Sequence, residues 1–132
     1  MTQDDKQLLL VDLCARLPYD VICSTVFGNS IVLYIDIYEG TIYISNNEWV
    51  DDFKPYLRSM SSMTEEEKEE LRQEQIKDEQ LFADCIKNHP EMRGLIIPHF
   101  AADWCDKNMF DYRGLIPKGL AIPVTEENNP YK

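Results

Sequence analysis

The stretch VICSTVFGNSIVLYIDIYEGTIYIS, residues 21–45, decides the fold class of this chain. Its β-branched and aromatic residues favour strands, and the turn-forming residues 28–30 and 39–40 interrupt it. The stretch therefore predicts an antiparallel meander with strands at 21–27, 31–38 and 41–45, followed by a short return strand at 48–50.

The second of these strands indicates which face of the sheet is buried. Side chains alternate between the two faces of a strand, so four aliphatic residues share one face and are expected to meet the core. These residues are Ile31, Leu33, Ile35 and Ile37. Lys54-Pro55 is expected to end the regular pairing, because proline has no N–H to donate.

Helices are predicted on either side of this sheet. A leucine pattern over residues 2–17 predicts an amphipathic helix that begins at Thr2, stops at Pro18 and packs its apolar stripe on the sheet. A short helix is predicted at 100–107, where two aromatic residues share one face.

A long acidic helix is predicted between them. Thr64 and Glu67 form a capping box, and the helix is expected to end before Pro90. Its first half is expected to project or lie on the surface, and its second half to pack against the rest of the domain. Its acidic face is a candidate surface for a partner protein, carried by Glu66, Glu69, Glu70 and Glu74.

Together these elements predict an α+β fold. It consists of an N-terminal helix packed on a small antiparallel meander sheet, the long acidic helix and a turn-rich C-terminal helical segment. The 132 residues fit a single domain, 1–132. Its expected parts are 1–58 (helix plus sheet), 59–88 (acidic helix), 89–124 (C-terminal segment) and a polar tail, 125–132, that frays.

The charge balance argues against several classes of partner. Asp and Glu number 24 against 13 Lys and Arg, which gives a net charge of −11. Nucleic acids and anionic membranes attract Lys and Arg, so neither is expected as a direct partner. No apolar run approaches the roughly 20 residues that span a bilayer, and the first residues lack a signal peptide. We therefore expect a cytoplasmic protein with reduced cysteines.

Aromatic residues gather on the predicted sheet: Tyr34, Tyr38, Tyr43 and Trp49. If Tyr34 and Tyr38 face outward, the group could line a ligand pocket or form a protein-binding hot spot. Alternatively, the C-terminal segment covers this face with its own apolar residues, and the sequence favours this second arrangement. The covering residues would be Trp104, Phe110, Tyr112 and Leu115.

Both histidines and two of the four cysteines fall close together: Cys85, His89, His99 and Cys105. Cys and His are the usual zinc ligands, and a Cys–His pair can act as a nucleophile and its base. The spacing matches no zinc-finger pattern, however, and no group that would orient a catalytic histidine stands at a recognisable position. We therefore expect buried thiols, no metal and no cofactor.

Three segments resemble a known family: LCARLPY at 13–19, KPYLRSMSSMTEEE at 54–67 and FDYRGLIPKGLA at 110–121. They are similar to short uncharacterised proteins of gut bacteria and of their phages and mobile elements. Members commonly have proline where this chain has Ser59. The resemblance implies no particular activity, cofactor or catalytic residue, but small acidic proteins of such elements often bind a host protein, sometimes as DNA mimics or inhibitors.

The sequence thus favours a non-enzymatic binding protein that docks on a host or partner protein through the acidic helix or the sheet aromatics. A small-ligand binding or sequestering protein is the first alternative, and a zinc- or cysteine-dependent enzyme is the second. An uncapped edge of the predicted sheet would also allow a homodimer.

Overall fold

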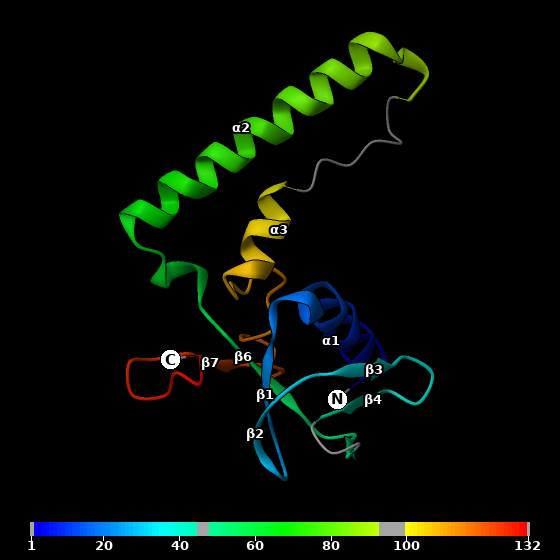
Figure 1. Ribbon diagram of the computed structural model, residues 1–132, viewed down its shortest axis with the longest axis vertical. Helices are drawn as coiled ribbons and strands as arrows, with labels where there is room; N and C mark the ends of the chain where they lie inside the picture. Colours follow the sequence, from blue (N-terminus) through cyan, green and yellow to red (C-terminus); the bar gives the residue numbers. More distant parts are fainter. Residues whose placement is uncertain (1, 45–47, 93–99, 132) are drawn as a thin grey trace.

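The computed structural model describes residues 2–44, 48–92 and 100–131. It confirms the α+β fold (Figure 1). The helices are α1 (Gln3–Arg16), α2 (Glu65–Asn88) and α3 (Phe100–Lys107), with 3-10 turns at η1 (Leu17–Tyr19), η3 (Met60–Ser62) and η4 (Pro90–Met92). The strands are β1 (Ile22–Thr25), β2 (Gly28–Ile31), β3 (Tyr34–Asp36), β4 (Thr41–Tyr43), β5 (Trp49–Val50), β6 (Lys54–Leu57) and β7 (Ile122–Pro123). None of the helices in the described part is long and apolar enough to cross a bilayer.

The strands form two sheets rather than one continuous meander. The first has the order β2-β1-β6-β7, and the second is the antiparallel meander β3-β4-β5. The chain crosses between them at Val32 and Leu33. The Val32 N–H donates to the carbonyl of Val21, immediately before β1 of the first sheet, and the Leu33 N–H donates to the carbonyl of Tyr43 in the second sheet. Consecutive N–H groups of an extended chain point in opposite directions, so adjacent residues can join two sheets.

Because of this crossing, the prediction that Ile31, Leu33, Ile35 and Ile37 share one buried face is wrong. Of these four residues only Ile35 is buried, while Ile31, Leu33 and Ile37 are exposed, and Val32 from the opposite set lies in the core. The alternation that places Ile35 inside holds within β3 but does not continue through the crossing into β2. The two faces of residues 31–38 are therefore not the faces of one strand.

The turn of the β1–β2 hairpin also differs from the prediction. Thr25 pairs with Gly28, so Val26 and Phe27 form the turn, and residues 28–30 belong to β2. Gly28 has a φ of 96°, in the region that favours glycine, and it lets the chain return after the turn.

Pro55 does not end the pairing, because β6 is an inner strand of the first sheet. Pro55 stands opposite Cys23 of β1. The main-chain groups of Cys23 are directed toward Ser30 of β2, so no ladder hydrogen bond is lost at the proline. The prediction that Lys54-Pro55 interrupts the sheet is wrong for this reason.

The main core joins both ends of the chain. Leu9 and Leu13 of α1 pack with residues of both sheets and with Leu115 and Leu120 near the C-terminus. The tail is also attached, because the Tyr131 hydroxyl donates to the Tyr56 carbonyl at 2.7 Å. The expectation that the tail 125–132 frays is therefore wrong at Tyr131.

Helix α2 begins and ends as predicted, with Thr64 as its N-cap and Asn88 as its last residue. It lies along one end of the molecule, with α3 between it and the sheets (Figure 1). Its first half contacts the body: Glu67 pairs with Arg58 at 2.7 Å, and Leu71 packs on a second apolar cluster. The second half touches α3 where the Ala101 N–H donates to Asp78 at 2.9 Å, but Leu81 and Phe82 are each 37% exposed. The prediction that the helix projects in its first half and packs in its second half is therefore wrong.

Candidate functional site

The outer face of the second sheet carries one aromatic residue from each strand. Tyr34 of β3 stands opposite Tyr43 of β4, which in turn stands opposite Trp49 of β5. The Tyr34 and Tyr43 rings meet edge to face, with their centroids 5.4 Å apart. Tyr34 and Trp49 are each 59% exposed, and Tyr43 between them is half-buried. We call Tyr34, Tyr43 and Trp49 the aromatic row.

The opposite face of the same sheet explains why the aromatic row meets solvent. Ile35, Ile42 and Val50 are aligned in the same register, and all three lie in the core. Because side chains alternate along each strand, burial of this aliphatic row directs the aromatic row outward. Three of the four predicted aromatic residues are therefore brought together. Tyr38 lies in the turn after β3, fully exposed, and is not part of the row.

The C-terminal segment does not cover this face, so the arrangement that the sequence favours is wrong. Trp104 stacks on Phe110 with ring centroids 5.4 Å apart, and both belong, with Tyr112, to a cluster that also includes Leu71 of α2. Leu115 belongs to the main core. These apolar residues hold α2 and α3 to the body and leave the outer face of the second sheet exposed.

Acidic residues accompany the aromatic row along the chain. Residues 34–52 contain no lysine or arginine, and their acidic residues are Asp36, Glu39, Glu48, Asp51 and Asp52. Asp36 follows Tyr34 by two positions in β3 and so lies on the same face of the sheet. Lys6 of α1 reaches this region, with its Nζ 3.2 Å from the Asp51 carbonyl oxygen. Alternation along the strand already places Asp36 on the face of Tyr34 from the sequence alone, but Asp36 was not among the predicted binding residues.

The glutamates predicted to bind a partner lie along α2, and most are already engaged. Glu69 accepts hydrogen bonds from Arg72 and Gln73, which hold the pKa of its carboxyl at about 2. Glu70 accepts from the Trp104 indole at 3.3 Å, and Glu74 pairs with Lys77 at 3.1 Å. Glu66 is exposed, with no ion pair to another described residue.

A buried cluster of four charges joins α1, α3 and the segment after α3, and the sequence analysis missed it. Arg16 holds Asp12 through two hydrogen bonds and donates to the Phe110 carbonyl at 2.6 Å. Arg113 bridges Asp12 at 2.8 Å and Asp106 at 3.1 Å. Two positive and two negative groups therefore balance each other, three of them buried and Arg113 with its side chain 18% exposed.

This cluster is best explained as structural. Its carboxylates and guanidinium groups are satisfied by each other and by main-chain carbonyls, and no described buried side-chain polar atom is left without a partner. Burial raises the pKa of Tyr112 beside it to about 12, so that phenol is not poised to give up its proton. The i, i+4 spacing of Asp12 and Arg16 was a visible signal. It did not indicate burial or the distant Asp106 and Arg113.

The Cys and His residues do not form a site among the residues that the structure describes. Cys105 is buried in the second cluster, where burial raises the pKa of its thiol. Cys85 is half-buried on α2. His89 is the C-cap residue of that helix, and its exposed side chain has Nδ1 3.4 Å from a carboxylate oxygen of Glu91. His99 lies outside the described residues. No group of three potential metal ligands occurs in the described part of the chain.

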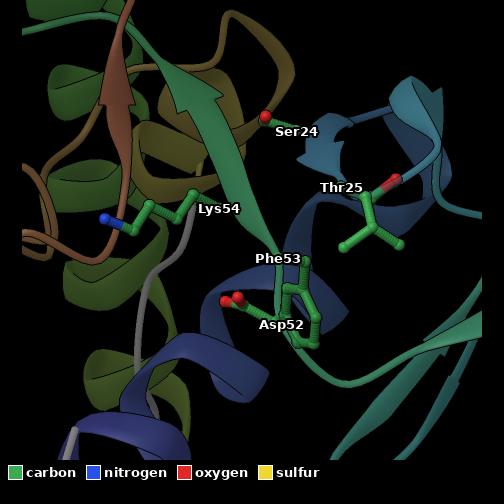
Figure 2. Close-up of a pocket in the computed structure, with 6 residues that line it drawn as sticks. Ser24, Thr25, Asp52, Phe53 and Lys54 are labelled. Carbon is green, nitrogen blue, oxygen red and sulfur yellow. The ribbon is translucent and has the colours of Figure 1, made fainter.

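A hollow of about 270 Å³ lies where the end of β1 meets the start of β6 (Figure 2). It is lined by Ser24, Thr25, Val26, Asp52, Phe53 and Lys54. The Thr25 hydroxyl donates to the Gly28 carbonyl and accepts from the Phe27 N–H, so it is used within the turn. No hydrogen bond links any two of the six lining side chains, and the hollow does not present a hydroxyl paired with a base.

Comparison of the chain with protein-family models, with curated proteins and with solved structures finds no significant match.

Proposed function

We propose that the protein is a non-enzymatic binding protein whose aromatic row docks on a basic segment of a partner protein. The observation that carries this proposal is the exposure of Tyr34 and Trp49 at 59% each on a sheet whose other face is buried. Tyr and Trp are the residue types most enriched in binding hot spots, because they bury much area at a small entropic cost.

The rigidity of the row supports a binding role. Each aromatic residue stands on a strand whose neighbouring residue is anchored in the core, and Tyr34 also contacts Tyr43 directly. A surface held in place before binding loses little conformational freedom when a partner arrives. The row therefore offers a pre-ordered apolar platform rather than three loose side chains.

The charge around the row supports a basic partner. The sequence of residues 34–52 has five acidic residues and no lysine or arginine, against which Lys6 reaches in from α1, and the whole chain has a net charge of −11. A guanidinium group can stack on a tyrosine or tryptophan ring while it pairs with a neighbouring carboxylate such as Asp36. An arginine-rich segment of another protein satisfies both features, in keeping with the expected attachment to a host or partner protein.

The acidic helix is the less favoured surface for the same partner. A partner that binds Glu69 or Glu74 must first displace Arg72 or Lys77 from within the helix. The exchange of one exposed ion pair for another gives little net free energy. Beside the aromatic row, Asp36 uses one carboxylate oxygen to accept the Glu39 N–H at 3.0 Å and holds no ion pair with another described residue, so no cation has to be displaced there.

The test uses arginine-rich, lysine-rich and glutamate-rich peptides as probes. Isothermal titration calorimetry measures the affinity of every variant. A parallel titration in a Trp104→Phe background, where Trp49 is the sole tryptophan, shows by its fluorescence whether the peptide binds at the row. We expect the arginine-rich peptide to bind best, binding to weaken with salt, and Tyr34→Ala or Trp49→Ala to reduce affinity by about tenfold or more.

Matched controls separate the two surfaces. Tyr19→Ala removes an exposed aromatic residue on η1, outside the second sheet, and is expected to leave affinity unchanged. Glu66→Gln tests the helix without breaking an ion pair. Affinity that survives Trp49→Ala but falls with Glu66→Gln would assign the partner to α2 and overturn the proposal.

A further inference from the structure

The free edge of the first sheet is an interaction surface separate from the aromatic row. β2 is the outermost strand of the order β2-β1-β6-β7, and three of its four residues are exposed. An edge strand carries main-chain groups that can pair with another strand, and proteins usually protect such edges with charges, prolines or bulges. The sequence of β2, Gly28–Ile31, contains no charge and no proline.

The hydrogen-bond pattern identifies which groups of β2 face outward. The Val32 N–H donates to the Val21 carbonyl, and Ser30 stands opposite Cys23. Bonded and non-bonded pairs alternate along an antiparallel ladder, so Ser30 bonds to β1, whereas the main-chain groups of Asn29 and Ile31 point away from it. No described residue pairs with the Asn29 or Ile31 main chain. Two N–H and two carbonyl groups are thus available along this edge.

Charge decides what can occupy the edge. From Val21 to Ile35 the chain has no charged residue, although its net charge is −11. Two copies of such a chain repel each other over most of their surfaces, and an uncharged stretch is where they can approach most closely. This stretch also exposes apolar side chains, with Val26 at 78% and Phe27 at 56% exposure. A second copy brings the same uncharged, apolar edge.

We propose that the protein forms a twofold dimer in which β2 pairs antiparallel with β2 of a second copy, with Ser30 on the axis. In this register Asn29 faces Ile31 of the second copy, and each pair exchanges two main-chain hydrogen bonds. The two four-stranded sheets become one continuous sheet across the axis.

The first test measures the mass of the full chain by sedimentation equilibrium over a range of concentrations and salt. We expect association of two 15.4 kDa chains that becomes tighter as salt rises, because salt screens the repulsion between the copies. This trend is opposite to that expected for the basic peptide at the aromatic row. Wild-type protein that remains monomeric at high salt and high concentration overturns the dimer without affecting the proposed function.

The second test introduces a charged residue at Ser30, on the twofold axis. Ser30→Glu and Ser30→Lys each place like charges opposite one another and are expected to be monomeric, whereas a mixture of the two variants is expected to form a heterodimer. The heterodimer also shows that both variants are folded. Dimers of Ser30→Glu as tight as those of the wild type would overturn the proposed register.

A third measurement needs no substitution. Amide hydrogen exchange of wild-type protein is expected to slow at Asn29 and Ile31 as the concentration rises, while exchange at Ser30, already bonded to β1, changes less. Equal exchange at Asn29 and Ile31 across the association range would show that β2 is not the contact.

Discussion

Arg16 holds Asp12 in a two-pronged contact that is excluded from solvent. Its Nε lies 2.9 Å from one carboxylate oxygen, and its Nη2 lies 3.0 Å from the other. The same guanidinium group reaches the Phe110 carbonyl from α1, so a local pair one helical turn long also fixes a segment 94 residues away. This contact joins the N-terminal helix to the C-terminal half of the fold.

Removal of Arg16 should therefore cost far more than removal of a surface ion pair. Arg16→Met leaves Asp12 and Asp106 sharing Arg113 alone in the interior, and we expect a loss of about 3–5 kcal/mol in the free energy of unfolding. Urea denaturation followed by circular dichroism measures it. Lys68→Met, which breaks the exposed pair with Glu65, is the control and should cost about 0–1 kcal/mol. Similar losses for the two variants would contradict the buried cluster.

Glu67 should make the stability of the protein depend on acid pH. Hydrogen bonds from Arg58 lower the pKa of Glu67 to about 2 from its ordinary value of 4.5. A carboxyl with a depressed pKa in the folded state stabilises the fold fully above its unfolded pKa and loses that effect as pH falls toward its folded pKa. The contribution should therefore be complete at neutral pH and disappear between about pH 4.5 and pH 2.

Glu67→Gln tests this dependence, because glutamine can still accept the Thr64 N–H of the capping box. We expect its free energy of unfolding at neutral pH to be about 1–2 kcal/mol below that of the wild type. The expected loss is no larger because the Arg58–Glu67 pair is partly exposed and solvent screens it. The difference should shrink as the pH is lowered in parallel urea titrations. Glu79→Gln on the exposed helix surface serves as the control, and a difference that stays constant with pH would rule out the ion pair as its source.

The two faces of the second sheet should respond oppositely to truncation. Ile42→Ala removes a fully buried side chain and should cost about 2–5 kcal/mol, whereas Trp49→Ala on the exposed face should cost less than about 1 kcal/mol. Chemical denaturation of both variants measures these losses. A cost for Trp49→Ala as large as that of Ile42→Ala would mean that the aromatic row serves the fold rather than binding.

The four cysteines should divide into two reactivity classes. Cys14 is exposed and Cys85 half-buried, whereas Cys23 and Cys105 are buried and burial raises the pKa of both thiols. A disulfide exchange reagent should modify Cys14 and Cys85 in the native protein and all four thiols only after unfolding. Mass spectrometry of the digested protein identifies the modified residues. Fast native labelling of Cys23 would contradict the packing of β1.

The starts of the helices and the α+β class could be predicted from the sequence, because their signals lie within one or two turns of chain. The capping boxes at Thr2 and Thr64 set the starts of α1 and α2. Within α2, Glu65–Lys68, Glu69–Arg72 and Glu74–Lys77 form i, i+3 ion pairs that need no distant partner. The α+β class followed from these helices and from the β-branched stretch. The candidate aromatic residues on the second sheet were also visible, because alternation within a short strand is a local property.

The way in which these elements combine depends on tertiary contacts. The crossing at Val32 and Leu33 divides the strands between two sheets, Pro55 is accepted inside a sheet because of its partner Cys23, and Trp104 packs against α2 rather than over the aromatic row. Each of these outcomes depends on a partner far away in the sequence. Asp12 and Arg16 show the difference most clearly: their spacing is local, but their burial comes from Arg113 and Asp106 about a hundred residues later, and local sequence patterns carry no information about that distance.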